Sequence, residues 1–113
     1  MPYENIPFDD FLRVQIHVGT VVDARLNEKA RKPALAMKID FGELGVKTTS
    51  AQICENYMNG NLIGTQVLAV TNLGAKNVAG LVSEVLVLAV VDPILGGVLL
   101  KPDRLVKNGT RVS

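Results

Sequence analysis

Apolar and polar residues alternate along most of this chain with a period of two, a pattern typical of strands that bury one face. The pattern is clearest at 34–41, where Leu35, Met37, Ile39 and Phe41 share one phase. The stretch 14–26 also alternates, 46–53 is rich in Thr and Ser, and 81–91 is nearly all apolar after Glu84. The stretch 66–72 and a shorter one near the end complete the set. The sequence therefore predicts strands over 14–26, 34–41, 46–53, 66–72, 81–91 and 98–101.

Glycines and polar stretches separate these strands. The stretch 42–45, Gly-Glu-Leu-Gly, predicts a hairpin turn. Gly19 lies inside the first strand, where a glycine is typical of a bend or bulge. The remaining segments predict connections: a helical turn at 7–12, a polar loop at 27–33, a broken helical connection at 54–65, a loop at 73–80 and a tail at 102–113.

The order of these elements indicates an all-β protein. The first five of these strands, with a short helical insertion between the third and the fourth, match a five-stranded Greek-key OB-fold barrel with terminal extensions. A small β-sandwich would give a similar pattern. We expect a single domain over 1–113 with its core at about 14–101, and terminal segments 1–13 and 102–113 outside that core.

The chain is rich in hydrophobic residues, at 48%. Part of this excess favours a subunit interface, because monomers rarely expose large apolar patches. The most apolar stretch, 85–100, is interrupted by Asp92-Pro93 and Gly96-Gly97. Neither half approaches the ~20 residues that span a bilayer, so we expect no membrane insertion. The first residues do not resemble a signal peptide, and we expect a cytoplasmic protein.

Catalytic and metal-binding patterns are missing from the sequence. Cys54 is the only cysteine and His17 the only histidine, which excludes an intrachain disulfide and a His/Cys metal cluster within these residues. There is no nucleophile elbow and no phosphate-binding loop. We therefore expect no enzyme activity, no cofactor and no metal.

Charge and aromatic content bear on nucleic-acid binding. Lys and Arg number 12 against 11 Asp and Glu, so phosphate binding would need a local basic patch. Aromatic residues make up 4% of the chain, with no Trp. Because OB folds that grip single strands stack bases on aromatic side chains, a general single-strand binder is disfavoured.

Several ordered segments resemble the tRNA-binding domain family of OB folds, and in particular its CsaA-type branch of export-related chaperones. The resemblance covers about 8–112. The segments that carry it are Ile16-His17-Val18-Gly19-Thr20-Val21-Val22, Lys38-Ile39-Asp40-Phe41-Gly42, Ser50-Ala51-Gln52, Asn72-Leu73, Ala79-Gly80, Ser83-Glu84-Val85-Leu86-Val87-Leu88 and Leu99-Leu100-Lys101-Pro102.

The resemblance implies an OB barrel that forms a homodimer through its terminal segments and carries a groove on each subunit. CsaA-type proteins bind unfolded or export-destined polypeptides, with the export machinery as a further partner, whereas their relatives bind tRNA. The implied dimer contacts are Phe8, Phe11, Leu105 and Val106.

Polar residues at motif positions or in the loops beside them are the candidate ligand contacts. For each there is a structural alternative, namely a solvated charge or a buried hydrogen bond. His17 stands where the family usually has Arg, and a mostly neutral side chain at that place weakens the case for tRNA. The candidate groove residues are His17, Arg31, Lys32, Ser50, Gln52, Asn72, Lys76, Ser83 and Glu84.

Two functions of different classes remain. Glu84 would repel phosphate and attract a basic peptide segment, which favours a polypeptide-binding chaperone. The alternative is a non-catalytic tRNA-binding module whose affinity falls steeply with salt. A passive dimerisation module is a third interpretation, if neither ligand binds.

Overall fold

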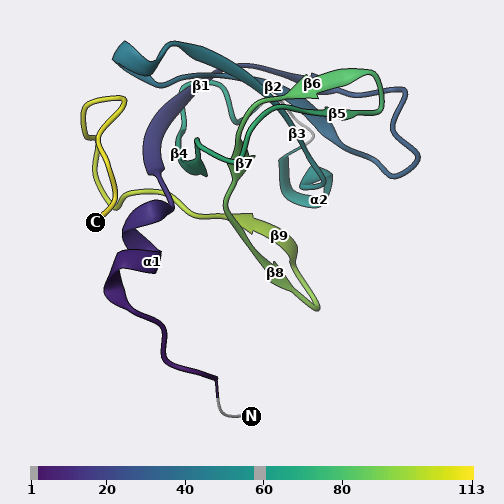
Figure 1. The fold of residues 1–113 in the computed structure, drawn as a ribbon. Helices are drawn as coiled ribbons and strands as arrows, with labels where there is room; N and C mark the ends of the chain where they lie inside the picture. Colours follow the sequence, from purple (N-terminus) through teal and green to yellow (C-terminus); the bar gives the residue numbers. More distant parts are fainter. Residues whose placement is uncertain (1–2, 58–60) are drawn as a thin grey trace.

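The computed structural model describes residues 3–57 and 61–113, and a five-stranded antiparallel sheet forms its centre. Its strands are β1 (Ile16–Leu26), β2 (Leu35–Asp40), β3 (Val46–Ala51), β4 (Gln66–Val70) and β7 (Leu86–Val87). They lie in the order β3-β2-β1-β4-β7 (Figure 1). Strand β2 alternates buried and less buried residues, as the sequence pattern predicts, whereas β4 is buried at four of its five positions.

The sheet curls until β3 meets the segment that leads into β7. Glu84 N donates to Thr48 O at 2.8 Å, and Thr49 Oγ1 donates to the buried carbonyl of Val85 at 2.8 Å. These bonds bring the two edges together and leave the five-stranded barrel nearly closed. The predicted OB-fold barrel is therefore confirmed, and the β-sandwich alternative is not.

The core lies inside this barrel. Leu35, Met37, Ile39 and Phe41, predicted to share a face, are all buried. Gly19 packs over them, because a Cβ atom there would lie 2.6 Å from Ile39 Cγ2 and 2.7 Å from Phe41 Cδ1. The bulge expected at Gly19 lies elsewhere: the β1–β2 register shifts between Val21 and Asp23. Close approach of buried side chains, not a bend, requires the glycine.

The loop expected at 73–80 contains a strand. There β5 (Lys76–Val78) pairs with β6 (Leu81–Ser83) in a hairpin. Ala79 and Gly80, with φ of 50° and 82°, form a two-residue turn, as right-twisted hairpins require. Asn77 Oδ1 supports the turn by accepting a hydrogen bond from Gly80 N at 3.1 Å. The loop prediction was wrong here because Ala79 is an unusual residue for a positive φ.

The apolar run 81–91, expected as one strand, is divided because it changes partners. Its first part lies in β6 beside β3, and β7 then pairs with β4. Next, β8 (Ala89–Asp92) pairs with β9 (Gly96–Leu99) in a hairpin outside the barrel. The turn of this β8–β9 hairpin is held by the Asp92 carboxylate, which accepts from Ile94 N at 2.8 Å and Leu95 N at 2.7 Å. These bonds lower the pKa of Asp92.

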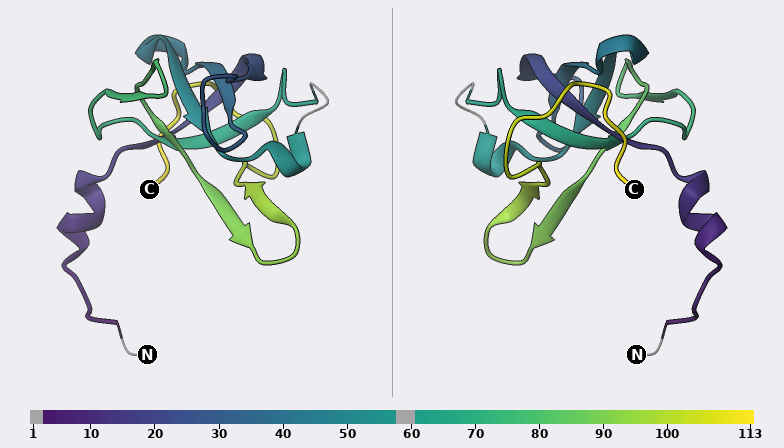
Figure 2. Two further views of the ribbon diagram at one scale, coloured as in Figure 1. Left: turned by 90° about the vertical axis from the view of Figure 1, so that its right-hand side faces the viewer. Right: turned by 90° about the vertical axis from the view of Figure 1, so that its left-hand side faces the viewer.

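The terminal segments differ in how they meet the barrel. Helix α1 (Phe8–Arg13), which confirms the expected helical turn, has no buried residue and projects from the same side as the β8–β9 hairpin (Figure 2). The tail instead runs along the start of β1, where Val18 N donates to Thr110 O at 2.9 Å and Val112 N to Ile16 O at 2.8 Å. The expected tail is therefore hydrogen-bonded to the backbone of β1, next to the sheet.

Two short helices complete the fold. The 3₁₀ turn η1 (Gly42–Leu44) occupies the predicted hairpin between β2 and β3. Helix α2 (Cys54–Tyr57) follows β3 and begins the expected broken connection, of which 58–60 lie outside the described residues. None of the helices within 3–57 and 61–113 has the length and apolar character needed to cross a membrane.

Candidate functional site

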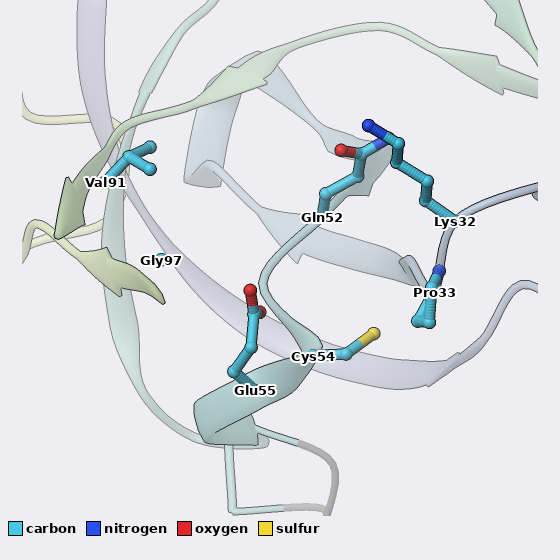
Figure 3. Close-up of a pocket in the computed structure, with 7 residues that line it drawn as sticks. All are labelled: Lys32, Pro33, Gln52, Cys54, Glu55, Val91 and Gly97. Atoms are coloured by element: carbon cyan, nitrogen blue, oxygen red, sulfur yellow. The ribbon is translucent and has the colours of Figure 1, made fainter. Parts of the chain in front are cut away.

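A groove of about 780 Å³ opens between the β8–β9 hairpin, α2 and the loop that joins β1 to β2 (Figure 3). We call it the hairpin groove. Its volume lies in the range of ligand pockets. The hairpin contributes Val91 and Gly97 to it. The other walls are formed by Lys32, Pro33, Gln52, Cys54 and Glu55.

Helix α2 fixes the hairpin in place beside the barrel. Asn56 Nδ2 donates to Leu95 O at 2.8 Å and to Gly97 O at 2.9 Å. The Tyr57 hydroxyl accepts from Leu99 N at 3.1 Å. These hydrogen bonds join side chains of α2 to backbone groups of the hairpin, and they hold the two walls of the hairpin groove together.

Close packing at Gly97 seats the hairpin on the core. A Cβ atom there would lie 2.9 Å from Ile53 Cγ2, and Ile53 is buried. Val91, which pairs with Gly97 across the hairpin, is 82% exposed and faces the hairpin groove. The groove thus has an apolar wall that nothing within the described residues covers.

The polar side chains of the hairpin groove are free to meet a ligand. In the described part of the chain, no hydrogen bond or ion pair engages the side chains of Lys32, Gln52 or Glu55. Lys32 brings a positive charge, Glu55 a negative one, and Gln52 an amide that both donates and accepts. An amide beside apolar walls matches a peptide group of an extended chain, which offers one acceptor and one donor.

Cys54 brings a thiol to the lining of the groove. Burial raises the pKa of Cys54, and the neighbouring Glu55 carboxylate raises it further. The thiol is therefore protonated at neutral pH and has the character of a buried structural cysteine. Among the residues that the structure describes, no three His, Cys, Asp or Glu side chains gather as metal ligands.

The predicted groove residues are divided between three places. Lys32 and Gln52 line the hairpin groove, and Arg31 precedes Lys32 in an exposed loop. Ser50 lies two residues before Gln52 on β3, where its backbone N–H donates to Ser83 Oγ at 3.4 Å.

A second group lies at the seam of the barrel. Thr48 N donates to Glu84 Oε2 at 2.9 Å, and Ser83 Oγ lies 3.0 Å from Thr49 Oγ1. Lys76 is opposite Ser83 in the β5–β6 hairpin. Ser83 and Glu84 thus have structural partners where β3 meets the segment that leads into β7.

A third group joins the N-terminal segment to the barrel. Asn72 Oδ1 accepts from Gln15 N at 2.9 Å, and Asn72 Nδ2 donates to Arg13 O at 2.8 Å. His17 Nδ1 lies 2.8 Å from Thr71 Oγ1. Burial, and then the charge of Arg111, lower the pKa of His17 and keep the ring neutral at pH 7. Neither His17 nor Asn72 lines the hairpin groove.

Three basic side chains lie on the β1–β2 loop, which contacts the turn of the β5–β6 hairpin. A Cβ atom at Gly80 would lie 3.4 Å from Lys29 Cδ, so the β1–β2 loop reaches the turn of the β5–β6 hairpin. We call the β1–β2 loop the basic loop. It carries Lys29, Arg31 and Lys32, and Lys76 lies on β5 of the neighbouring hairpin, at the end away from its turn.

The predicted dimer contacts lie on the terminal segments, and all of them except the half-buried Phe11 are exposed. Phe8 is 68% exposed and its ring centroid lies 6.1 Å from that of Phe11. Leu105 is 83% exposed and Val106 is partly exposed on the tail. The turn of the β8–β9 hairpin exposes one more large apolar side chain, Ile94, which is 93% exposed.

Sequence reasoning missed the rest of the hairpin groove. Glu55 and Cys54 look like ordinary helix residues, and only the fold brings α2 against the hairpin. A signal for Val91 did exist: Asp92-Pro93 followed by Gly96-Gly97 marks a tight turn, which predicts neighbouring residues at an exposed hairpin end.

Known proteins resemble this chain over nearly all of its length. The family described as "Putative tRNA binding domain" matches residues 16–111. The chaperone CsaA of Bacillus anthracis str. Ames superposes with a TM-score of 0.91 at 46% identity, covering 97% of this chain and 100% of that one. The CsaA chaperone of Picrophilus torridus has a TM-score of 0.90 at 37% identity, covering 96% and 100%.

Methionine–tRNA ligases are also similar in sequence. That of Methanococcoides burtonii is 36% identical over 105 residues, which cover 93% of this chain and 15% of the ligase. That of Bacteroides fragilis is 37% identical over 108 residues, which cover 96% and 16%. This chain thus spans about one sixth of the length of the ligases it matches. From the family match and these relatives, the chain belongs to the tRNA-binding domain family.

Proposed function

We propose that this protein is a polypeptide-binding chaperone of the CsaA type, which holds extended segments of unfolded or export-destined polypeptide in its hairpin groove. The observation that carries the proposal is the match to CsaA chaperones, which covers at least 96% of this chain and 100% of theirs. The methionine–tRNA ligases, by contrast, match over a small part of their length. The role is one of binding, without a catalytic step, in the cytoplasm.

The hairpin groove supplies the two features that binding of unfolded polypeptide needs. Val91 and Pro33 offer apolar contact to a client side chain that would be buried in a folded protein. Gln52 offers an amide to the client backbone, which has the same donor and acceptor at every residue. Contacts of this kind tolerate many sequences, as a chaperone requires.

A homodimer is part of the proposal. The uncovered side chains of Phe8, Ile94 and Leu105 are supporting observations, because they lie on segments that project from the barrel or end its tail. Pairing of two copies through these surfaces would remove them from water and present two hairpin grooves. Two linked grooves would hold one client more tightly than either alone.

Binding of tRNA is the second candidate function. The basic loop favours it, since it carries Lys29, Arg31 and Lys32, and the Lys29 side chain reaches the β5–β6 hairpin, whose strand β5 carries Lys76. Lysine and arginine bind phosphates with release of counterions, so this interaction would weaken steeply as salt rises. The family description and the methionine–tRNA ligase relatives support the same candidate.

Titration of both ligands at two ionic strengths tests the proposal. A permanently unfolded model polypeptide should bind and should be kept from aggregating, with an affinity that changes little between low and moderate salt. Tight, salt-sensitive binding of tRNA without any effect on the polypeptide would overturn the chaperone assignment and favour the second candidate.

A further inference from the structure

Two opposite charges lie in the hairpin groove without neutralising each other. Lys32 extends from the β1–β2 loop, and Glu55 extends from the first turn of α2 (Figure 3). In the part of the chain that the structure describes, neither side chain has an ion-pair partner. A ligand that crosses the groove therefore meets a cation toward one side and an anion toward the other.

The position of Glu55 is set by the hairpin. A Cβ atom at Gly96 would lie 2.9 Å from Glu55 Oε1, so the carboxylate rests directly against the backbone of the turn. Gly96 has a φ of 80°, a conformation that favours glycine, and its missing side chain leaves the room that Glu55 occupies. The negative charge is thus at the hairpin side of the groove and the positive charge at the loop side.

We infer that the hairpin groove selects client segments in which an apolar residue is flanked by an acidic residue on one side and a basic residue on the other. This inference rests on the proposed function and names its substrate class. The apolar residue contacts Val91 and Pro33, the client carboxylate faces Lys32, and the client cation faces Glu55. A segment with like charges on both sides places one of them against a charge of its own sign.

Short labelled peptides test this selection directly. Three peptides share an apolar centre and differ only in the flanking charges: one acidic and one basic, both acidic, or both basic. Fluorescence anisotropy should give the mixed-charge peptide an affinity about fivefold higher than either like-charge peptide, the size expected for partly exposed ion pairs. In about 1 M salt, where the Debye length is about 3 Å, the preference should disappear while binding persists.

Charge-swap variants show which residues act. Lys32→Glu should change the preference to the both-basic peptide, and Glu55→Lys to the both-acidic peptide. The double variant should recover the preference for mixed charge. Glu43→Lys and Lys101→Glu, exposed charges that do not line the groove, serve as matched controls and should keep the wild-type order.

The outcomes separate this inference from the proposed function. If all three peptides bind the wild type equally, or if the swaps leave the order unchanged, the selection is wrong and polypeptide binding still stands. If no peptide and no unfolded polypeptide binds the wild type, the proposed function fails and the selection with it. Salt dependence of the wild-type preference decides the matter even if a variant does not fold.

Discussion

Thr48 and Glu84 hold each other across the seam of the barrel. Glu84 N donates to Thr48 O at 2.8 Å, and Thr48 N donates back to the Glu84 carboxylate at 2.9 Å. Glu84 thus makes one hydrogen bond to Thr48 with its backbone N–H and one with its side chain, whereas a residue in a regular strand pair would make two backbone bonds. The carboxylate takes the place of a backbone carbonyl at the point where the chain leaves β3 and continues into β7, which pairs with β4.

Removal of this carboxylate should destabilise the fold. Glu84→Ala leaves Thr48 N without its partner in a half-buried position, which should lower the free energy of unfolding by about 1–3 kcal/mol. Glu84→Gln keeps an acceptor oxygen and should cost less. Urea denaturation measures both, with the exposed Glu43→Ala as the control. Equal stability of Glu84→Ala and the control would show that the seam bond contributes little.

Gly19→Ala tests the tight packing over the core. The added methyl group would lie 2.6 Å from Ile39 Cγ2 and 2.7 Å from Phe41 Cδ1, and both side chains are fully buried. Overpacking of this kind typically lowers the free energy of unfolding by about 1–3 kcal/mol. A thermal melt compares it with Val22→Ala, at a partly exposed position of the same strand. A stability loss at Gly19 no larger than the loss at Val22 would contradict the packing explanation.

The pH dependence of stability should reflect His17. Burial and the charge of Arg111 lower the pKa of His17, so the folded chain binds this proton less readily than the unfolded chain does. The stability that follows is fully present above the ordinary pKa of about 6.5 and is lost as pH falls below it. His17→Gln removes the titrating group, so its urea midpoint should fall less than that of wild type between about pH 7.5 and about pH 5.5. Parallel pH profiles would rule out this role.

Self-association should depend on the uncovered aromatic side chain of α1. Phe8→Asp places a charge on a helix that contributes no buried residue to the barrel, so the fold should persist while association weakens. Sedimentation velocity at micromolar concentration should show a dimer for wild type and mainly monomer for the variant. Glu4→Gln, in the same exposed segment, is the control. A monomeric wild type would overturn the proposed dimer.

Much of the fold was predictable from alternation, because a strand that buries one face repeats with a period of two. Leu35 to Phe41 shows this directly, since each predicted core position is buried. The run 81–91 shows the limit. Its residues are nearly all apolar, and such a run does not record that β6, β7 and β8 pair with three different partners.

The candidate site was predictable only in part, for a related reason. Lys32 and Gln52 lie next to strand ends, where ligand contacts of a barrel are expected, and they do line the hairpin groove. Glu55 and Val91 are 36 residues apart and meet through the packing of α2 on the β8–β9 hairpin. Only tertiary contacts such as those of Asn56 with Leu95 and Gly97 bring them together.

The apolar wall of the hairpin groove gives the most direct test of the central claim. Anisotropy of a labelled, permanently unfolded polypeptide should be compared for wild type, Val91→Asp and Val46→Asp. Both valines are exposed, but only Val91 lines the groove. Loss of one buried valine contact predicts an affinity about tenfold lower for Val91→Asp, with Val46→Asp unchanged. Wild-type affinity in Val91→Asp would contradict polypeptide binding at this groove.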